Sequence, residues 1–135
     1  MQTSENGISF IQANEGFVPT VYNDNGHPAI GYGHDLLPGE SFPQAIDQAE
    51  GVALLQHDIA PLEAYLNQAE TTLNQNQFDA LIDFGYNLGL AALHMLLSHG
   101  LSEVPEQVPR WNHVNGLPNA ALSARRAAEV ALFQS

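Results

Sequence analysis

The sequence has no cysteine and no lysine, and only three arginines oppose its 15 acidic residues. Without cysteine, disulfides play no part, and the redox compartment is left open. The formal net charge of −12 argues against nucleic acid and anionic membrane surfaces as partners. No apolar run approaches the roughly 18 residues that a membrane span needs, so no such span is expected.

The 135 residues are 44% apolar and 13% charged, which predicts one globular domain over residues 1–135. We expect this domain to act as a monomer. The segment Met1–Ser4 lacks the basic and apolar regions of a secretory signal. We therefore expect synthesis in the cytoplasm and release by another factor. The six histidines lack the spacing of metal ligands, so no metal and no other cofactor is expected.

Most of the chain carries helical patterns with recognisable ends. Ser4 is a good N-cap and Gly16 a good helix terminator. Capping-box patterns begin at Asp47 and Asn74, and Pro61 predicts a kink or break inside the helix that follows Asp47. Helices are therefore expected over about 5–14, 47–66, 74–89, 90–99, 102–111 and 119–133.

One segment near the N-terminus has extended character instead. Val18–Tyr22 and Ala29–Tyr32 can pair as two strands around a turn at Asn23–Gly26. This β-hairpin is the one sheet that the sequence indicates. The predicted fold class is α+β and mostly helical, with a hairpin lobe over about 17–34 and a helical lobe formed by the remainder.

Two carboxyl groups occupy contrasting surroundings. Glu15 continues the apolar face of the first helix, and burial of such a group raises its pKa. Asp24 lies in a polar turn where a carboxylate stays hydrated. This contrast suits the acid and base of a glycosidase. Taken alone, however, such a pair is common in small proteins.

The surrounding motifs are more specific. Glu15-Gly-Phe, Tyr22-Asn-Asp-Asn-Gly26 and Ile30-Gly-Tyr-Gly-His34 follow one another in order, and later come Asn76-Gln-Phe-Asp-Ala-Leu81 and Arg125-Arg-Ala-Ala-Glu129. In sequence and spacing this series resembles the phage-type lysozymes, the endolysins or muramidases of glycoside hydrolase family 24. The resemblance covers almost the whole chain.

The resemblance implies a lysozyme-like fold and a muramidase that acts on bacterial peptidoglycan without a cofactor. The bond cut would be the β-1,4 bond between N-acetylmuramic acid and N-acetylglucosamine. Glu15 matches the general acid. Asp24 matches the carboxylate that activates water or stabilises the developing positive charge. The cleft would lie between the hairpin and the helical lobe.

The resemblance also implies supporting residues around these two carboxyls. Arg125 matches an arginine that reaches the general acid, and we expect this contact here. For Arg126 we expect a surface position and a pair with Glu129 one helical turn away. His34 matches a histidine that pairs with an acid on the long helix, and Asp58 is the matching acid.

Four further side chains are candidates for binding the sugar, namely Tyr22, Tyr32, Tyr86 and Asn87. For Asn87 a role at the helix end beside Gly89 is a second interpretation.

One position departs from the family pattern. Ala29 stands where the family has a catalytic threonine before Ile-Gly-Tyr-Gly-His, so the hydroxyl that holds the attacking water is missing. Another group holds the water, with Asn25 and His27 as nearby candidates, or catalysis is slow or altered. A catalytically weak module that binds peptidoglycan or a protein partner is the alternative function, and a chitinase-like or transglycosylase activity is a third.

Overall fold

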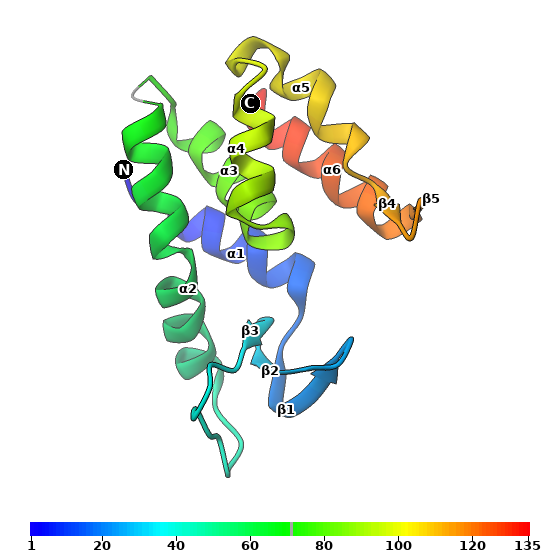
Figure 1. Ribbon diagram of the computed structural model, residues 1–135. Coiled ribbons are helices and arrows are strands. Elements are labelled where there is room, and N and C mark those ends of the chain that lie inside the picture. Colours follow the sequence, from blue (N-terminus) through cyan, green and yellow to red (C-terminus); the bar gives the residue numbers. More distant parts are fainter. Residues whose placement is uncertain (71) are drawn as a thin grey trace.

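The computed structural model describes residues 1–70 and 72–135, and it confirms the α+β class (Figure 1). A three-stranded sheet lies at one end of the molecule, helix α1 runs across the middle, and α3 to α6 gather at the other end (Figure 1). The main elements are α1 (Glu5–Glu15), β1 (Val18–Asp24), β2 (His27–Gly31), β3 (His34–Asp35), α2 (Gln48–Ala69), α3 (Gln75–Leu88), α4 (Leu90–Leu97), α5 (Val104–Gln107), β4 (His113–Val114), β5 (Leu117–Pro118) and α6 (Ala120–Phe133).

The sheet is antiparallel with the order β1-β2-β3. Asn25 and Gly26 both have positive φ and form the tight turn between β1 and β2. Strand β2 therefore begins at His27, two residues earlier than predicted, and the turn after it adds the short strand β3. The expectation of one sheet is wrong. A second turn with positive φ, at Asn115 and Gly116, joins β4 and β5 into a small hairpin.

The predicted helix caps are present. The Ser4 side chain accepts a hydrogen bond from Gly7 N, Asp47 caps α2, and Asn74 forms a full capping box at α3. Of the kink or break predicted at Pro61, the break does not occur, because α2 continues from Gln48 to Ala69. Pro61 lies on the exposed side of this helix, where water can satisfy the carbonyl group that proline leaves without a partner.

The segment expected to be one helix over 102–111 forms three short turns instead: 3₁₀ turns at Leu101–Glu103 and Val108–Arg110 flank α5. Pro105 and Pro109 lie at the starts of the second and third turns, where a missing N–H costs little.

Helix α3 forms the centre of the core. Phe78, Leu81, Ile82 and Phe84 are almost completely buried, and α3 packs against α1, α2, α4 and α6. Helix α3 ends at Gly89, which has positive φ, and its residue Asp83 accepts a 3.5 Å hydrogen bond from Asn14 near the end of α1. Within the two described stretches of the chain, each helix is too short or too polar to cross a bilayer.

The substitution Gly7→Ala tests the packing of α1 on α3. A Cβ at this position would lie 2.6 Å from Cγ of Asp79 and 2.6 Å from Cγ2 of Thr3. Asp79 is buried and accepts a hydrogen bond from Ser4 N, so it has little freedom to move. We expect Gly7→Ala to lower the free energy of unfolding by about 1–3 kcal/mol, as overpacking does, although alanine usually favours a helix. Urea unfolding measures the change.

Ser9→Ala, at an exposed position of α1, is the control, and its free energy of unfolding should change little. Equal stability of the two variants would contradict this packing.

Candidate active site

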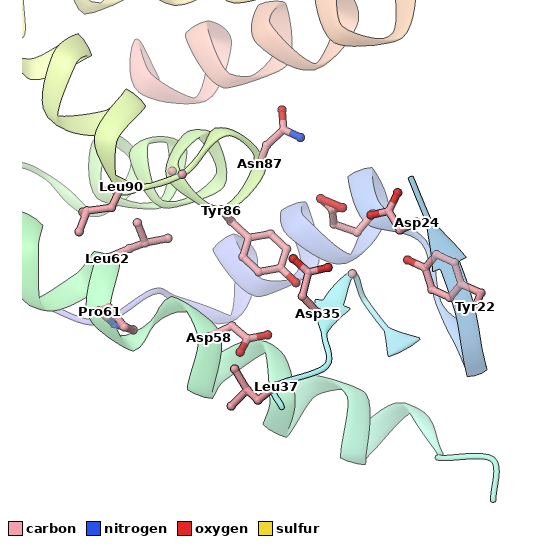
Figure 2. A pocket seen from close by; sticks show the side chains of 14 residues that line it. Tyr22, Asp24, Asp35, Leu37, Asp58, Pro61, Leu62, Tyr86, Asn87 and Leu90 are labelled. Carbon is pink, nitrogen blue, oxygen red and sulfur yellow. The ribbon is translucent and has the colours of Figure 1, made fainter. Parts of the chain in front are cut away.

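A cleft of about 500 Å³ lies between the sheet and the helices, as predicted (Figure 2). Tyr22, Asp24 and Asp35 line it from the sheet, and Glu15 lines it from the end of α1. Asp58, Pro61 and Leu62 of α2 and polar side chains from the end of α3 complete the wall. The cleft is thus lined by carboxyl groups on one side and by a mixed surface on the other.

Glu15 is the last residue of α1, and its side chain is 19% exposed. It lies over the turn at Gly33, where an added Cβ would come within 3.2 Å of Glu15 Oε1. Arg125 Nη1 donates a hydrogen bond to Glu15 Oε2 at 2.8 Å, so the predicted contact is present. Burial raises the pKa of Glu15, Arg125 offsets part of the rise, and the charges of Asp83 and Asp24 add to it. The net shift is upward, which suits a general acid.

Arg125 is held in place by Asp83, a residue that the sequence analysis missed. Arg125 Nε and Nη2 donate to the two oxygens of Asp83 at 3.0 and 2.8 Å, and Asp83 is completely buried. Burial alone lowers the pKa of Arg125, but the hydrogen bonds and charges of Asp83 and Glu15 raise it overall. The signal available in the sequence was an acid inside the apolar stretch Ala80–Phe84 of α3.

The expectation of a surface position for Arg126 is wrong. Its side chain is completely buried, with Nη2 donating to Glu129 Oε1 at 2.7 Å and to Asn87 Oδ1 at 2.8 Å. The pair with Glu129 was expected, but the spacing of two residues on a helix does not show whether another helix covers them. Here α6 packs on α3. Burial raises the pKa of Glu129 to about 9, with Asp83 adding to the rise and Arg126 opposing it.

Asp24 is the last residue of β1, and it is exposed beside the tight turn. Tyr22 lies two residues earlier, so both side chains project from the same face of the strand into the cleft. Burial raises the pKa of Tyr22, and the charges of Asp24, Glu15 and Asp35 raise it further. The charges of Asp24, Glu15 and Asp35 therefore all reach Tyr22, on the sheet side of the cleft.

Of the four predicted sugar-binding residues, Tyr22, Tyr86 and Asn87 line the cleft. Tyr32 does not. Its ring is 5% exposed and packs in the core against Phe17, with ring centroids 5.1 Å apart. The role expected for the Tyr32 side chain is therefore corrected to a structural one. Its carbonyl oxygen accepts a 2.6 Å hydrogen bond from the Tyr86 hydroxyl, and this contact joins the sheet to α3.

His34 lies outside the cleft and is 3% exposed. Its Nδ1 is 2.7 Å from Asp58 Oδ2, which is the predicted pair, and its Nε2 is 2.7 Å from Glu40 Oε1. Burial lowers the pKa of His34, but the hydrogen bonds and charges of Glu40 and Asp58 raise it overall. The pKa of Glu40 is lowered by the Leu37 backbone N–H and by His34. The three side chains join β3 to α2.

Ala29 lies in the middle of β2 and is completely buried. The two candidates for replacing the missing hydroxyl, Asn25 and His27, lie in or beside the tight turn, and both are exposed. They are not among the residues that line the cleft.

Comparison with known proteins agrees with this geometry. The sequence model of the phage lysozyme family matches residues 12–129. The chain is 36% identical to an endolysin of Acyrthosiphon pisum secondary endosymbiont phage 1, over 100% of this chain and 99% of that protein. It is 35% identical over its whole length to an endolysin of Bacillus phage PZA, of which it spans only 56%. The chain therefore belongs to the phage lysozyme family, a class of glycosidases.

The fold agrees as well. The muramidase domain of SpmX from Asticaccaulis excentricus superimposes with a TM-score of 0.85 at 29% identity, over 99% of this chain and 98% of that one. The likeness includes both the sheet and the helices that form the cleft.

The His34 contacts predict a pH-dependent stability. Because the folded pKa of His34 is raised, its contribution is fully present below the unfolded value near 6.5, and it is lost as pH rises through the folded pKa. We expect the difference in unfolding free energy between wild type and His34→Asn to shrink as pH rises above about 6.5. Urea unfolding at several pH values measures this difference.

His99→Asn, at an exposed position, is the control. Parallel stability curves for wild type and His34→Asn would refute the prediction.

The Arg125 contact predicts the ionisation of Glu15. Arg125→Met removes the group that favours the charged carboxylate, so we expect the pKa of Glu15 to rise and the alkaline limb of the pH–rate profile to move upward. NMR of the Glu15 carboxyl carbon measures the pKa directly. Arg125→Lys keeps the charge and should cause a smaller rise.

The control for this experiment is Arg110→Met. Arg110 is 64% exposed, its Nη2 lies 3.9 Å from Oε1 of Glu106, and it is not among the charges that shift the pKa of Glu15. Because Arg126 is buried, it is not a suitable comparison. An unchanged Glu15 pKa in Arg125→Met would show that Arg125 does not set the ionisation of this acid.

Proposed function

We propose that this protein is a muramidase that hydrolyses the β-1,4 bond between N-acetylmuramic acid and N-acetylglucosamine in bacterial peptidoglycan. One observation carries the proposal: Glu15, partly buried and hydrogen-bonded to Arg125, opens onto the same cleft as the exposed Asp24 on the sheet. Family membership supports the same activity.

In this proposal Glu15 is the general acid. Its raised pKa keeps a larger share of the carboxyl protonated near neutral pH, and that proton passes to the leaving glycosidic oxygen. Asp24 acts from the sheet side, where its carboxylate takes a proton from the attacking water or stabilises positive charge at the anomeric carbon. The contrast between a buried acid and an exposed carboxylate is what this chemistry requires.

The cleft also has the surfaces that a sugar needs. Leu62 and Leu90 provide apolar area for the faces of the rings, and Tyr22 and Asn87 provide polar groups at its edges. The Tyr86 hydroxyl already donates to the Tyr32 carbonyl, so we assign Tyr86 to the wall rather than to a direct hydrogen bond with the sugar.

A second candidate function is favoured by Ala29. Without the family's hydroxyl beside the water site, the protein would be a catalytically weak module that binds peptidoglycan or a protein partner. New reducing ends separate the two functions, because a binder produces none. The chemistry of the product ends separates hydrolysis from transglycosylation.

The substitution Glu15→Gln tests the assignment. A carboxamide cannot donate the acid proton, and we expect a loss of roughly 10²–10⁴-fold in hydrolysis, the usual contribution of general acid catalysis. Mass analysis of purified peptidoglycan after digestion identifies both the bond cut and the rate. Glu5→Gln, at the exposed opposite end of α1, is the matched control and should keep its activity.

Two results would overturn the proposal. A wild-type protein that binds the saccharide but releases no new reducing ends is a binder. Retention by Glu15→Gln of more than about a tenth of the wild-type rate would remove Glu15 from the role of general acid.

A further inference from the structure

We propose that Asp35 is a further catalytic residue, whose carboxylate holds the attacking water at the place where Ala29 leaves the sheet without a hydroxyl. The proposal rests on the proposed hydrolysis. The proposed role of Asp35 explains how the attacking water is held in a chain that lacks the family's threonine.

The register of the sheet supplies the first argument. Ala29 in β2 has Tyr22 of β1 as its partner on one side and Asp35 of β3 as its partner on the other. Directly opposed residues of antiparallel strands project from the same face, with Cβ atoms about 4.5–5.5 Å apart. Tyr22, Ala29 and Asp35 thus form one row across the sheet, and the Asp35 side chain rises beside Ala29.

The cleft supplies the second argument. Tyr22 and Asp35, the two ends of the row, both line the cleft, whereas Ala29 between them is completely buried. Figure 2 shows the Asp35 carboxylate between Tyr86 on the helical side and Tyr22 with Asp24 on the sheet side. Burial is the main cause of the raised pKa of Tyr22 and of Tyr86, and the charge of Asp35 adds to the rise in both.

Two other acids near this position are already engaged. Asp58 and Glu40 are each 2.7 Å from a ring nitrogen of His34, whereas the Asp35 side chain is exposed to the cleft. A carboxylate oxygen accepts a hydrogen bond from water, as a threonine hydroxyl does. Asp35 reaches the same region from the neighbouring strand, because its side chain is one atom longer than that of threonine.

The step then runs as follows. The water oxygen, with one hydrogen bonded to Asp35, attacks the anomeric carbon on the face opposite the leaving group. The bond from that carbon to the glycosidic oxygen breaks, and its electron pair stays on the oxygen, which takes the proton of Glu15. The second hydrogen of the water passes as a proton to Asp24. Asp35 orients the nucleophile throughout.

The test compares Asp35→Ala and Asp35→Asn with wild type on a soluble peptidoglycan saccharide. We expect kcat of Asp35→Ala to fall by roughly 10²-fold, as when one preorganised hydrogen-bonding group is lost, with little change in saccharide binding. Asp35→Asn keeps an acceptor oxygen and should lose less. Glu103→Gln, at an exposed position, removes one negative charge elsewhere and serves as the control.

A second pair of variants asks whether residues 29 and 35 share one task. Restoring a hydroxyl by Ala29→Thr should raise the rate much more in Asp35→Ala than in wild type, which is a non-additive effect of neighbouring residues. Because Ala29 is completely buried, Ala29→Ser is made in parallel as the smaller change.

Two outcomes overturn the inference while the proposed function stands. One is an Asp35→Ala variant with the kcat of an active wild type. The other is an equal gain from the hydroxyl at position 29 in both backgrounds. An inactive wild type, in contrast, overturns the proposed function itself.

Discussion

The guanidinium group of Arg125 is the interaction on which the site depends. It bonds to Asp83 with Nε and Nη2 and to Glu15 with Nη1, so one side chain of α6 fixes an acid of α3 and the end of α1. A buried charge is costly unless it is paired and hydrogen-bonded. Arg125 and Asp83 satisfy each other, and Glu15 is held at the edge of the cleft, where it is only partly desolvated.

The buried charges also set the protonation of Glu15. Burial raises the pKa of Glu129, Asp83 adds to the rise, and Arg126 opposes it. Burial also opposes the ionisation of Glu15 and is the largest effect on its pKa. The charge and hydrogen bond of Arg125 lower the pKa of Glu15, whereas the charges of Asp83 and Asp24 raise it. The pKa of Glu15 therefore results from two opposing contributions, burial and the contact with Arg125.

Features encoded by neighbouring residues were predictable from the sequence, and features made by packing were not. The caps at Ser4 and Asn74 and the turn at Asn25 depend on a few adjacent residues, and the structure has them where they were expected, although the strands extend closer to the turn. The burial of Arg126 and the inward ring of Tyr32 depend on which helix or sheet face covers them. No spacing along one element reveals its neighbour, so these two expectations failed.

The sheet explains how a catalytic group can change its position in the sequence without a change of fold. Residues directly opposed across antiparallel strands share a face, so the space above Ala29 is accessible from Asp35 as well as from residue 29 itself. A carboxylate at this place differs from a hydroxyl in one respect: its negative charge also stabilises the positive charge that develops at the anomeric carbon. The same charge repels the carboxylates of peptidoglycan, as does the net charge of −12. Replacing the hydroxyl at residue 29 by the carboxylate of Asp35 would stabilise the transition state more than it strengthens substrate binding. Such a difference raises kcat.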